Sequence, residues 1–94
     1  MRQFEIEIPR FGIKVICALK SPKVADAYMD LVIQGKTRKA MELLFEEVVQ
    51  NKEEIAPLLE KYPLLKASIV AKIAEALGGV VDAEIREIEQ SAKN

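Results

Sequence analysis

Residues 3–8 and 13–20 both place an apolar side chain at every second position. This period of two predicts two strands, each with one face toward a core and one toward water. Pro9 and Gly12 lie in the four residues between these runs, and Gly12 can adopt the positive φ of a tight turn. The pattern therefore predicts an N-terminal β-hairpin with strands at about 3–8 and 13–20.

After the hairpin, apolar residues recur every three or four positions, which is the spacing of one face of a helix. The first such run predicts a helix over about 22–34, with Ser21 as its cap, Pro22 at its first position and Gly35 at its end. The second run predicts a helix over about 37–50 that begins with Thr37 as its cap.

Two prolines divide the next part of the chain. Asn51 and Glu54 have the spacing of a capping box, but Pro57 would then lie beyond the first turn, so we expect the helix to begin at about 54 and end at 61. Pro63 disfavours helical geometry at Tyr62 and can begin a new helix. We therefore predict that this dipeptide joins two helices, the second over about 63–77 and ended by two glycines.

The last fifteen residues, 80–94, form a charged tail. Val81, Ala83 and Ile85 alternate like a strand, but Val81, Ile85 and Ile88 also have helical spacing, with Asp82 as a possible cap. We expect a helix over about 82–92 or a partly disordered, mobile end. The whole chain, 1–94, is predicted to be one α+β domain that is mainly helical.

The composition of this 94-residue chain restricts its chemistry. It has no histidine, one cysteine, no apolar run long enough for a membrane span and no glycine-rich phosphate loop. Cys17 is expected to be a buried strand residue in a protein of a reducing compartment. We therefore expect no catalytic, cofactor-binding or metal-binding residues, and a soluble protein that is not an enzyme.

Charge is unevenly distributed along the chain. Residues 1–41 contain eight basic and four acidic residues, whereas residues 42–94 contain six basic and eleven acidic residues. Such a gradient can orient a partner or favour head-to-tail contact between copies of the chain, so a homo-oligomer is one expectation. Lys36, Arg38 and Lys39 form the one cluster suited to nucleic acid, and the acidic balance of the whole chain argues against that partner.

Protein contact is the remaining role that these residues favour. A two-stranded hairpin has two edges with unpaired backbone groups, and the helices can cover its apolar face but not both edges. We therefore predict pairing with another chain. Phe11, at the hairpin tip, is the large side chain most expected to be exposed, and Phe45 and Tyr62 are expected to pack in the core. The candidate contact residues are Phe11, Tyr28, Arg38 and Lys39.

The order of these parts resembles the small tail assembly chaperones of long-tailed bacteriophages. The resemblance covers about residues 3–79 and is carried by the hairpin loop in IPRFG and by the corner in LLEKYPLLKASIVAKIAEALGG. It implies structural roles for four loop positions and four corner positions: Pro9, Arg10, Phe11, Gly12, Leu58, Leu59, Tyr62 and Pro63.

The same resemblance implies a non-enzymatic protein of the bacterial host cytoplasm that binds the tape measure protein and tail tube subunits during assembly. No cofactor and no membrane contact are expected. Two alternatives remain from the residues themselves: a small nucleic-acid-binding or regulatory domain, and a structural subunit retained in the phage particle. Neither a particular partner nor an oligomeric state follows from the sequence.

Overall fold

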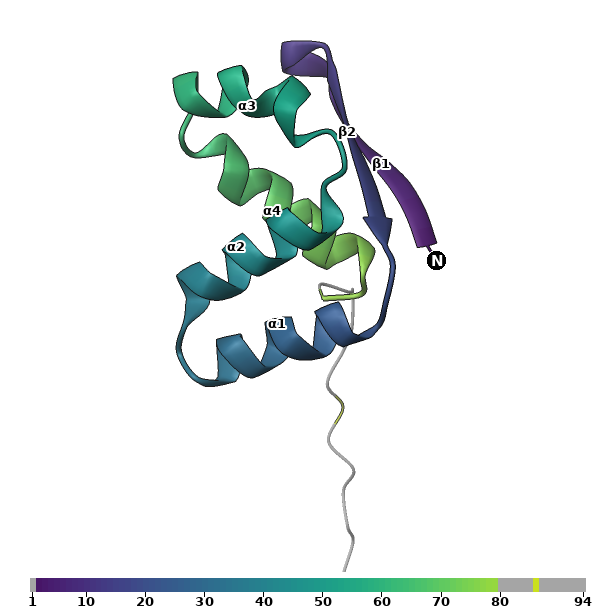
Figure 1. The fold of residues 1–94 in the computed structure, drawn as a ribbon, viewed down its shortest axis with the longest axis vertical. Helices are drawn as coiled ribbons and strands as arrows, with labels where there is room; N and C mark the ends of the chain where they lie inside the picture. The colour runs from purple at the N-terminus through teal and green to yellow at the C-terminus, as the bar shows by residue number, and fades with distance from the viewer. Residues whose placement is uncertain (1, 80–85, 87–94) are drawn as a thin grey trace, which may run out of the picture.

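The computed structural model describes residues 2–79 and Arg86. A β-hairpin precedes four helices, which confirms the predicted α+β class (Figure 1). The elements, in chain order, are β1 (Arg2–Ile8), a 3-10 turn (Pro9–Phe11), β2 (Ile13–Leu19), α1 (Lys23–Ile33), α2 (Thr37–Val48), α3 (Lys52–Lys61) and α4 (Leu65–Ala76). The expected helix over 82–92 lies outside the described residues, Arg86 excepted.

The hairpin is antiparallel, with a register that runs from Arg2 opposite Leu19 to Ile8 opposite Ile13. Gly12 closes the loop with φ 62°, and its N–H donates to the carbonyl of Pro9 at 3.1 Å. A left-handed conformation of this kind favours glycine, so the predicted role of Gly12 is confirmed. The second strand ends at Leu19, one residue before the predicted end.

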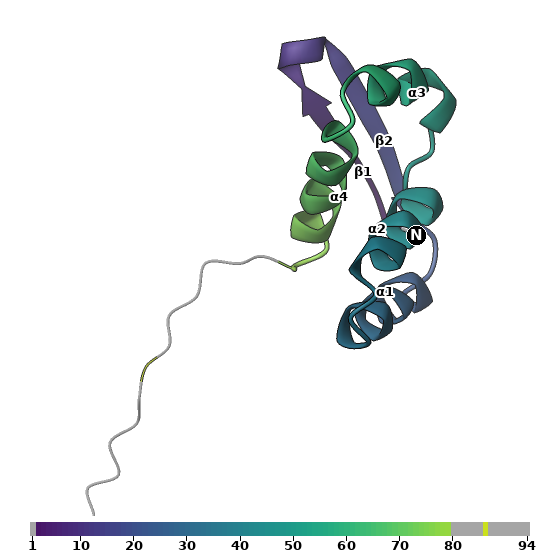
Figure 2. The same ribbon diagram turned by 90° about the vertical axis from the view of Figure 1, so that its left-hand side faces the viewer.

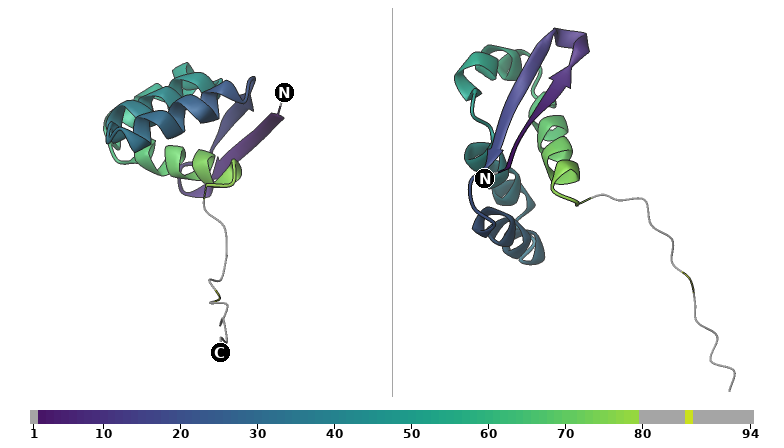
Figure 3. Two further views of the ribbon diagram at one scale, coloured as in Figure 1. Left: turned by 90° about the horizontal axis from the view of Figure 1, so that it is seen from below. Right: turned by 90° about the vertical axis from the view of Figure 1, so that its right-hand side faces the viewer.

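The helices pack on the apolar face of the hairpin. In Figure 3, α2 and α3 lie on the side of β2, and α4 lies on the side of β1. The buried core residues come from β2, α2, the residue that follows α2, α3 and α4. Helix α1 contributes only partly buried side chains, through its packing on α2. The core is formed by Val15, Cys17, Leu44, Phe45, Val48, Val49, Ile55, Ile69, Val70 and Ile73.

Glycines end α1 and α4 as predicted. Gly35 has φ 77° and Gly78 has φ 89°, the left-handed geometry of a helix C-terminus. The helix starts follow the sequence less closely. Ser21 accepts a hydrogen bond from the N–H of Lys23 at 3.2 Å, and α1 begins at Lys23, one residue later than expected. Thr37 is the first helical residue of α2, and its side chain makes no capping bond, so that prediction is wrong.

The segment between α2 and α3 differs most from the prediction. The expected helix over 37–50 ends at Val48, because Val49 is extended and forms an antiparallel bridge with Cys17. The expected start of α3 at 54 is also wrong, since the helix begins at Lys52 with Pro57 inside it. Pro57 removes the helical partner of the Glu53 carbonyl, and Glu53 is exposed, so water can replace that bond.

Tyr62 and Pro63 join α3 to α4, as predicted. Tyr62 leaves the helical region, with φ −124° and ψ 82°, and α4 begins at Leu65 rather than at 63.

Phe45 is buried in the core, as expected. One ion pair ties α4 to α2, because Lys66 Nζ lies 2.8 Å from Glu42 Oε2 and also 4.8 Å from the centre of the Phe45 ring.

Candidate protein-binding groove

The outer edge of β2 is closed by the segment that follows α2. The N–H of Gln50 donates to the carbonyl of Ile16 at 2.7 Å. The Asn51 side chain continues this pairing, since its Oδ1 accepts from the N–H of Ile16 at 2.9 Å and its Nδ2 donates to the carbonyl of Lys14 at 2.8 Å. Asn51 stands at the N-cap position of α3, as its spacing suggested, and its Nδ2 also lies 3.3 Å from Glu54 Oε2. Its side chain makes no capping bond to the helix backbone, however, and instead extends the pairing along β2.

These bonds also determine which backbone groups of β1 face outward. Successive residues of an antiparallel strand direct their N–H and C=O groups to opposite sides. Ile16 directs both groups toward residues 50 and 51, so its neighbours Val15 and Cys17 direct theirs toward β1, where the register places Ile6 and Phe4. It follows that Gln3, Glu5 and Glu7 direct their backbone groups away from β2. We call this side of β1 the open edge.

The open edge is unpaired within residues 2–79. In this part of the chain the sheet contains β1 and β2 only, and no backbone hydrogen bond joins β1 to a segment other than β2. Unpaired donors and acceptors along an exposed strand are a template for pairing with another chain. The predicted liability of the hairpin therefore applies to one edge and not to both.

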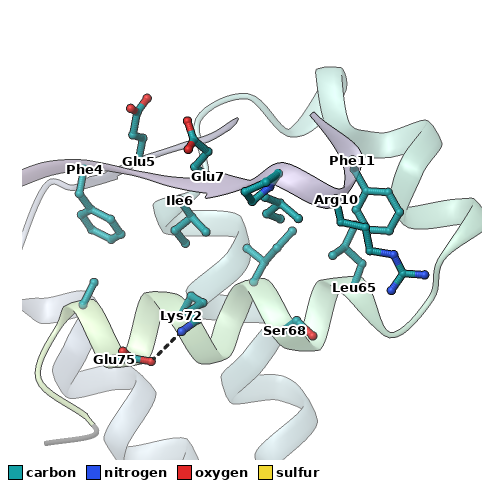
Figure 4. A pocket seen from close by; sticks show the side chains of 14 residues that line it. Phe4, Glu5, Ile6, Glu7, Arg10, Phe11, Leu65, Ser68, Lys72 and Glu75 are labelled. Carbon is teal, nitrogen blue, oxygen red and sulfur yellow. Dashed lines mark hydrogen bonds and ion pairs between the residues drawn. The ribbon is translucent and has the colours of Figure 1, made fainter. Parts of the chain in front are cut away.

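A groove of about 730 Å³ lies between the open edge and α4. Figure 4 shows Phe4 and Ile6 pointing from β1 toward α4, while Glu5 and Glu7 point away from it. Leu65 and the buried Ile69 contribute apolar surface from α4. The full lining is Phe4, Glu5, Ile6, Glu7, Ile8, Pro9, Arg10, Phe11, Leu65, Ser68, Ile69, Lys72, Glu75 and Ala76.

The apolar wall of the groove is only half-buried. On β2, the inward-facing Val15 and Cys17 are both 0% exposed. On β1, Phe4, Ile6 and Ile8 face the same side of the sheet but are of intermediate exposure. A strand added at the open edge would place its own side chains over this apolar surface and remove it from water.

Charged side chains border the groove. Glu5 and Glu7 share one cation, since Lys14 Nζ lies 4.0 Å from a carboxylate oxygen of each. On α4, Lys72 and Glu75 pair with each other at 3.3 Å (Figure 4). Arg10 lies over the ring of Phe11, 5.2 Å from its centre, at the end of the groove near the hairpin tip.

The predicted contact residues do not form one site. Phe11 lines the groove, but it is half-buried against Tyr62, with 4.7 Å between ring centres, rather than exposed. Tyr28 is partly buried on α1 and packs against the core. Arg38 and Lys39 are exposed at the start of α2, away from the hairpin tip (Figure 2). Their roles in binding stay predictions.

Sequence reasoning missed Phe4, Ile6 and Leu65 as groove residues. The alternation over residues 3–8 identified the inward face of β1, but periodicity does not reveal how completely helices cover a face. The signal in the sequence was the small number of strands. A two-stranded hairpin has no further strand to lie beside its edges, so at least one edge is expected beside a helix.

A second apolar surface lies on α1. Met29 is 57% exposed and Ile33 is 79% exposed, with Val32 between them on the same helix. The basic residues Lys36, Arg38 and Lys39 follow directly in the chain and are all exposed. This surface is separate from the groove, since α1 contacts mainly α2.

Cys17 is a buried core residue, as predicted. Burial raises the pKa of the Cys17 thiol to about 11, because the thiolate would lose its hydration. At neutral pH the thiol is therefore protonated and a poor nucleophile. Residues 2–79 with Arg86 contain no group of three or more histidine, cysteine, aspartate or glutamate side chains placed to hold a metal ion.

None of the helices described here combines the length and the apolar composition needed to cross a membrane. The sequence matches no protein-family model, and neither a curated protein nor a solved structure is similar enough to it to count as a match. The geometry of the open edge and the groove therefore provides the structural basis for a functional proposal.

Proposed function

We propose that this protein is a non-enzymatic assembly chaperone that binds the tape measure protein and tail tube subunits of a long-tailed bacteriophage. The observation that carries the proposal is the open edge of β1 beside a half-buried apolar groove. An exposed edge and an apolar surface together suit binding to polypeptide segments that would otherwise aggregate. The identity of the partners comes from the resemblance of the hairpin loop and the Tyr62-Pro63 corner.

The proposed mechanism is reversible masking. The protein would cover aggregation-prone segments of a long partner until polymerisation of the tail tube displaces it. Release requires modest affinity, and a groove that is open along its length allows a bound segment to leave without unfolding of the chaperone.

Co-expression tests this function directly. The full chain, purified with a tag, is expected to retain the tape measure and tail tube proteins encoded beside its own gene, and to keep a tape measure fragment from aggregating in a light-scattering assay. Absence of both the complex and the protection would contradict the proposal.

Mass spectrometry of mature particles separates this function from that of a retained structural subunit. A chaperone is expected in assembly intermediates and absent from finished particles. One or more copies per finished particle would favour the structural subunit.

Nucleic acid binding is a second candidate, because Lys36, Arg38 and Lys39 are exposed together at the start of α2. It predicts a gel shift that weakens with salt, through release of counterions, and that disappears when all three residues become alanine. No shift at low salt would exclude this candidate.

A further inference from the structure

We propose that the open edge of β1 binds an extended segment of a partner protein in which apolar residues alternate with basic residues. The segment would form a third strand, with its apolar side chains in the groove and its basic side chains beside Glu5 and Glu7. This inference rests on the proposed function for the existence of a protein partner, and it specifies the chemistry that the partner presents.

The backbone of β1 determines the form of the partner. Gln3, Glu5 and Glu7 direct their N–H and C=O groups outward, so a matching segment is extended over about five residues. A helical segment has no free donors and acceptors along its length to satisfy such an edge. An added strand meets this requirement and lies beside β1, above the groove and α4.

The inner face of β1 determines every second side chain of the partner. In a sheet, side chains of neighbouring strands at matching positions point to the same face. The side chains level with Phe4 and Ile6 would therefore enter the groove, where Leu65 and Ile69 form the opposite apolar wall. Phe4 and Ile6 are only partly buried without a partner, and completing their burial favours apolar residues at these positions.

The outer face of β1 determines the remaining side chains. Glu5 and Glu7 point away from the groove and would be direct cross-strand neighbours of the partner's outward residues (Figure 4). Lys14 lies 4.0 Å from both carboxylates, so two negative charges share a single positive charge. Opposite charges across strands are favourable and like charges unfavourable, which favours lysine or arginine in the partner.

Charge argues against two other segments that could pair with the open edge. One is β1 of a second copy of the chain, and the other is the segment that follows α4. Antiparallel pairing of two copies centred on Glu5 would set Glu5 opposite its own counterpart. The segment after α4 has apolar residues at 81, 83 and 85, but Asp82 and Glu84 alternate with them and would lie beside Glu5 and Glu7. Both occupants would place acids against acids, whereas a basic alternating segment would not.

Three end-blocked heptapeptides test the inference with the full chain. The first alternates valine with lysine, the second alternates valine with glutamate, and the third contains the residues of the first in two blocks. Titration of the isotope-labelled protein followed by NMR measures each affinity. We expect the valine–lysine peptide to bind at least about tenfold more tightly than the other two. Its advantage over the valine–glutamate peptide is expected to shrink at high salt, because salt screens the charge difference between them. The amides of Glu5 and Glu7 are expected to become protected from exchange on binding.

Two matched double charge reversals test whether Glu5 and Glu7 determine the preference for a basic peptide. E5K/E7K is expected to weaken binding of the valine–lysine peptide by at least about tenfold and to strengthen binding of the valine–glutamate peptide. E46K/E47K makes the same change in net charge on exposed residues of α2 and is expected to leave both affinities within about twofold. Glu5→Pro removes one outward N–H at the open edge and is expected to abolish binding of both peptides.

Several outcomes would overturn the inference. They are equal affinity for the three peptides, peptide-induced shifts confined to α1, protection of the Glu5 amide by self-association without peptide, or a tenfold gain in peptide affinity when residues 80–94 are removed. If the tape measure protein binds wild type and E5K/E7K equally, the inference fails and the proposed function stands. If the valine–lysine peptide binds at the open edge but neither phage partner does, the proposed function fails and the inference stands.

Discussion

The two edges of the hairpin face different surroundings. The edge of β2 is closed by residues 49–51. Its backbone is satisfied by a main-chain bond from Gln50, which belongs to the bridge between Val49 and Cys17, and by the Asn51 side chain. Among residues 2–79, the edge of β1 has only the groove and α4 beside it. Two strands with the same apolar alternation therefore differ in what protects them, and the contrast identifies β1 as the strand available to a partner.

The same contrast extends to the side chains. Val15 and Cys17 on β2 are fully buried, whereas their partners on β1, Ile6 and Phe4, are only partly buried. The segment that closes the backbone edge of β2 also supplies Val49, which is fully buried. Closing an edge and completing the core are thus performed by one short segment on one side of the sheet.

The largest expected effect comes from a charge at the closed edge. Val49→Asp would place a carboxylate in the core beside Cys17, so we expect it to lower the free energy of unfolding by about 3–5 kcal/mol. Gln3→Asp, on the exposed side of β1, is expected to change it by no more than about 0.5 kcal/mol. Urea denaturation of both variants measures the difference, and similar losses would show that the two edges do not differ.

The pKa of Cys17 predicts a loss of stability at high pH. Between the ordinary thiol pKa of 9.0 and the native value of about 11, the unfolded state binds fewer protons than the native state, so stability falls as pH rises through this range. The expected loss is about 2–3 kcal/mol in total. Cys17→Ala lacks this component, so its stability is expected to fall less between pH 9 and 11. Parallel pH profiles for the two proteins would contradict this account of Cys17.

Loss of the Asn51 amide is expected to have a smaller effect. Asn51→Ala removes the partners of the Ile16 N–H and the Lys14 carbonyl, which are partly accessible to water, so we expect a loss of about 1–2 kcal/mol. Gln3→Ala serves as the matched change at the open edge and is expected to cost less than about 0.5 kcal/mol. A cost for Asn51→Ala no greater than that of the control would mean that Asn51 does not close the edge of β2.

Sequence periodicity predicted the hairpin, the four described helices and their joins, because those features depend on local spacing and on glycine and proline. The alternation over residues 3–8, Gly12, Gly35 and the Tyr62-Pro63 join were all interpreted correctly. Local signals were sufficient at these places because no distant contact overrides them.

The largest errors lie where distant contacts decide the structure. Val49 leaves the helix because it pairs with β2, and the Asn51 side chain binds β2 instead of capping the backbone of α3. Asn51 and Ile16 are 35 positions apart in the chain. A capping box and a strand extension require the same residue type at position 51, so the sequence pattern did not distinguish them. The groove could not be predicted for the same reason, since it depends on where α4 lies relative to β1.

Amide hydrogen exchange in the isolated protein tests the difference between the two edges most directly. We predict that the amides of Glu5 and Glu7 exchange at least about tenfold faster than the amides of Phe4 and Ile6 on the same strand and of Ile16 at the closed edge. Slow exchange at Glu5 and Glu7 in the free monomer would show that the edge of β1 is already paired, and would contradict the account.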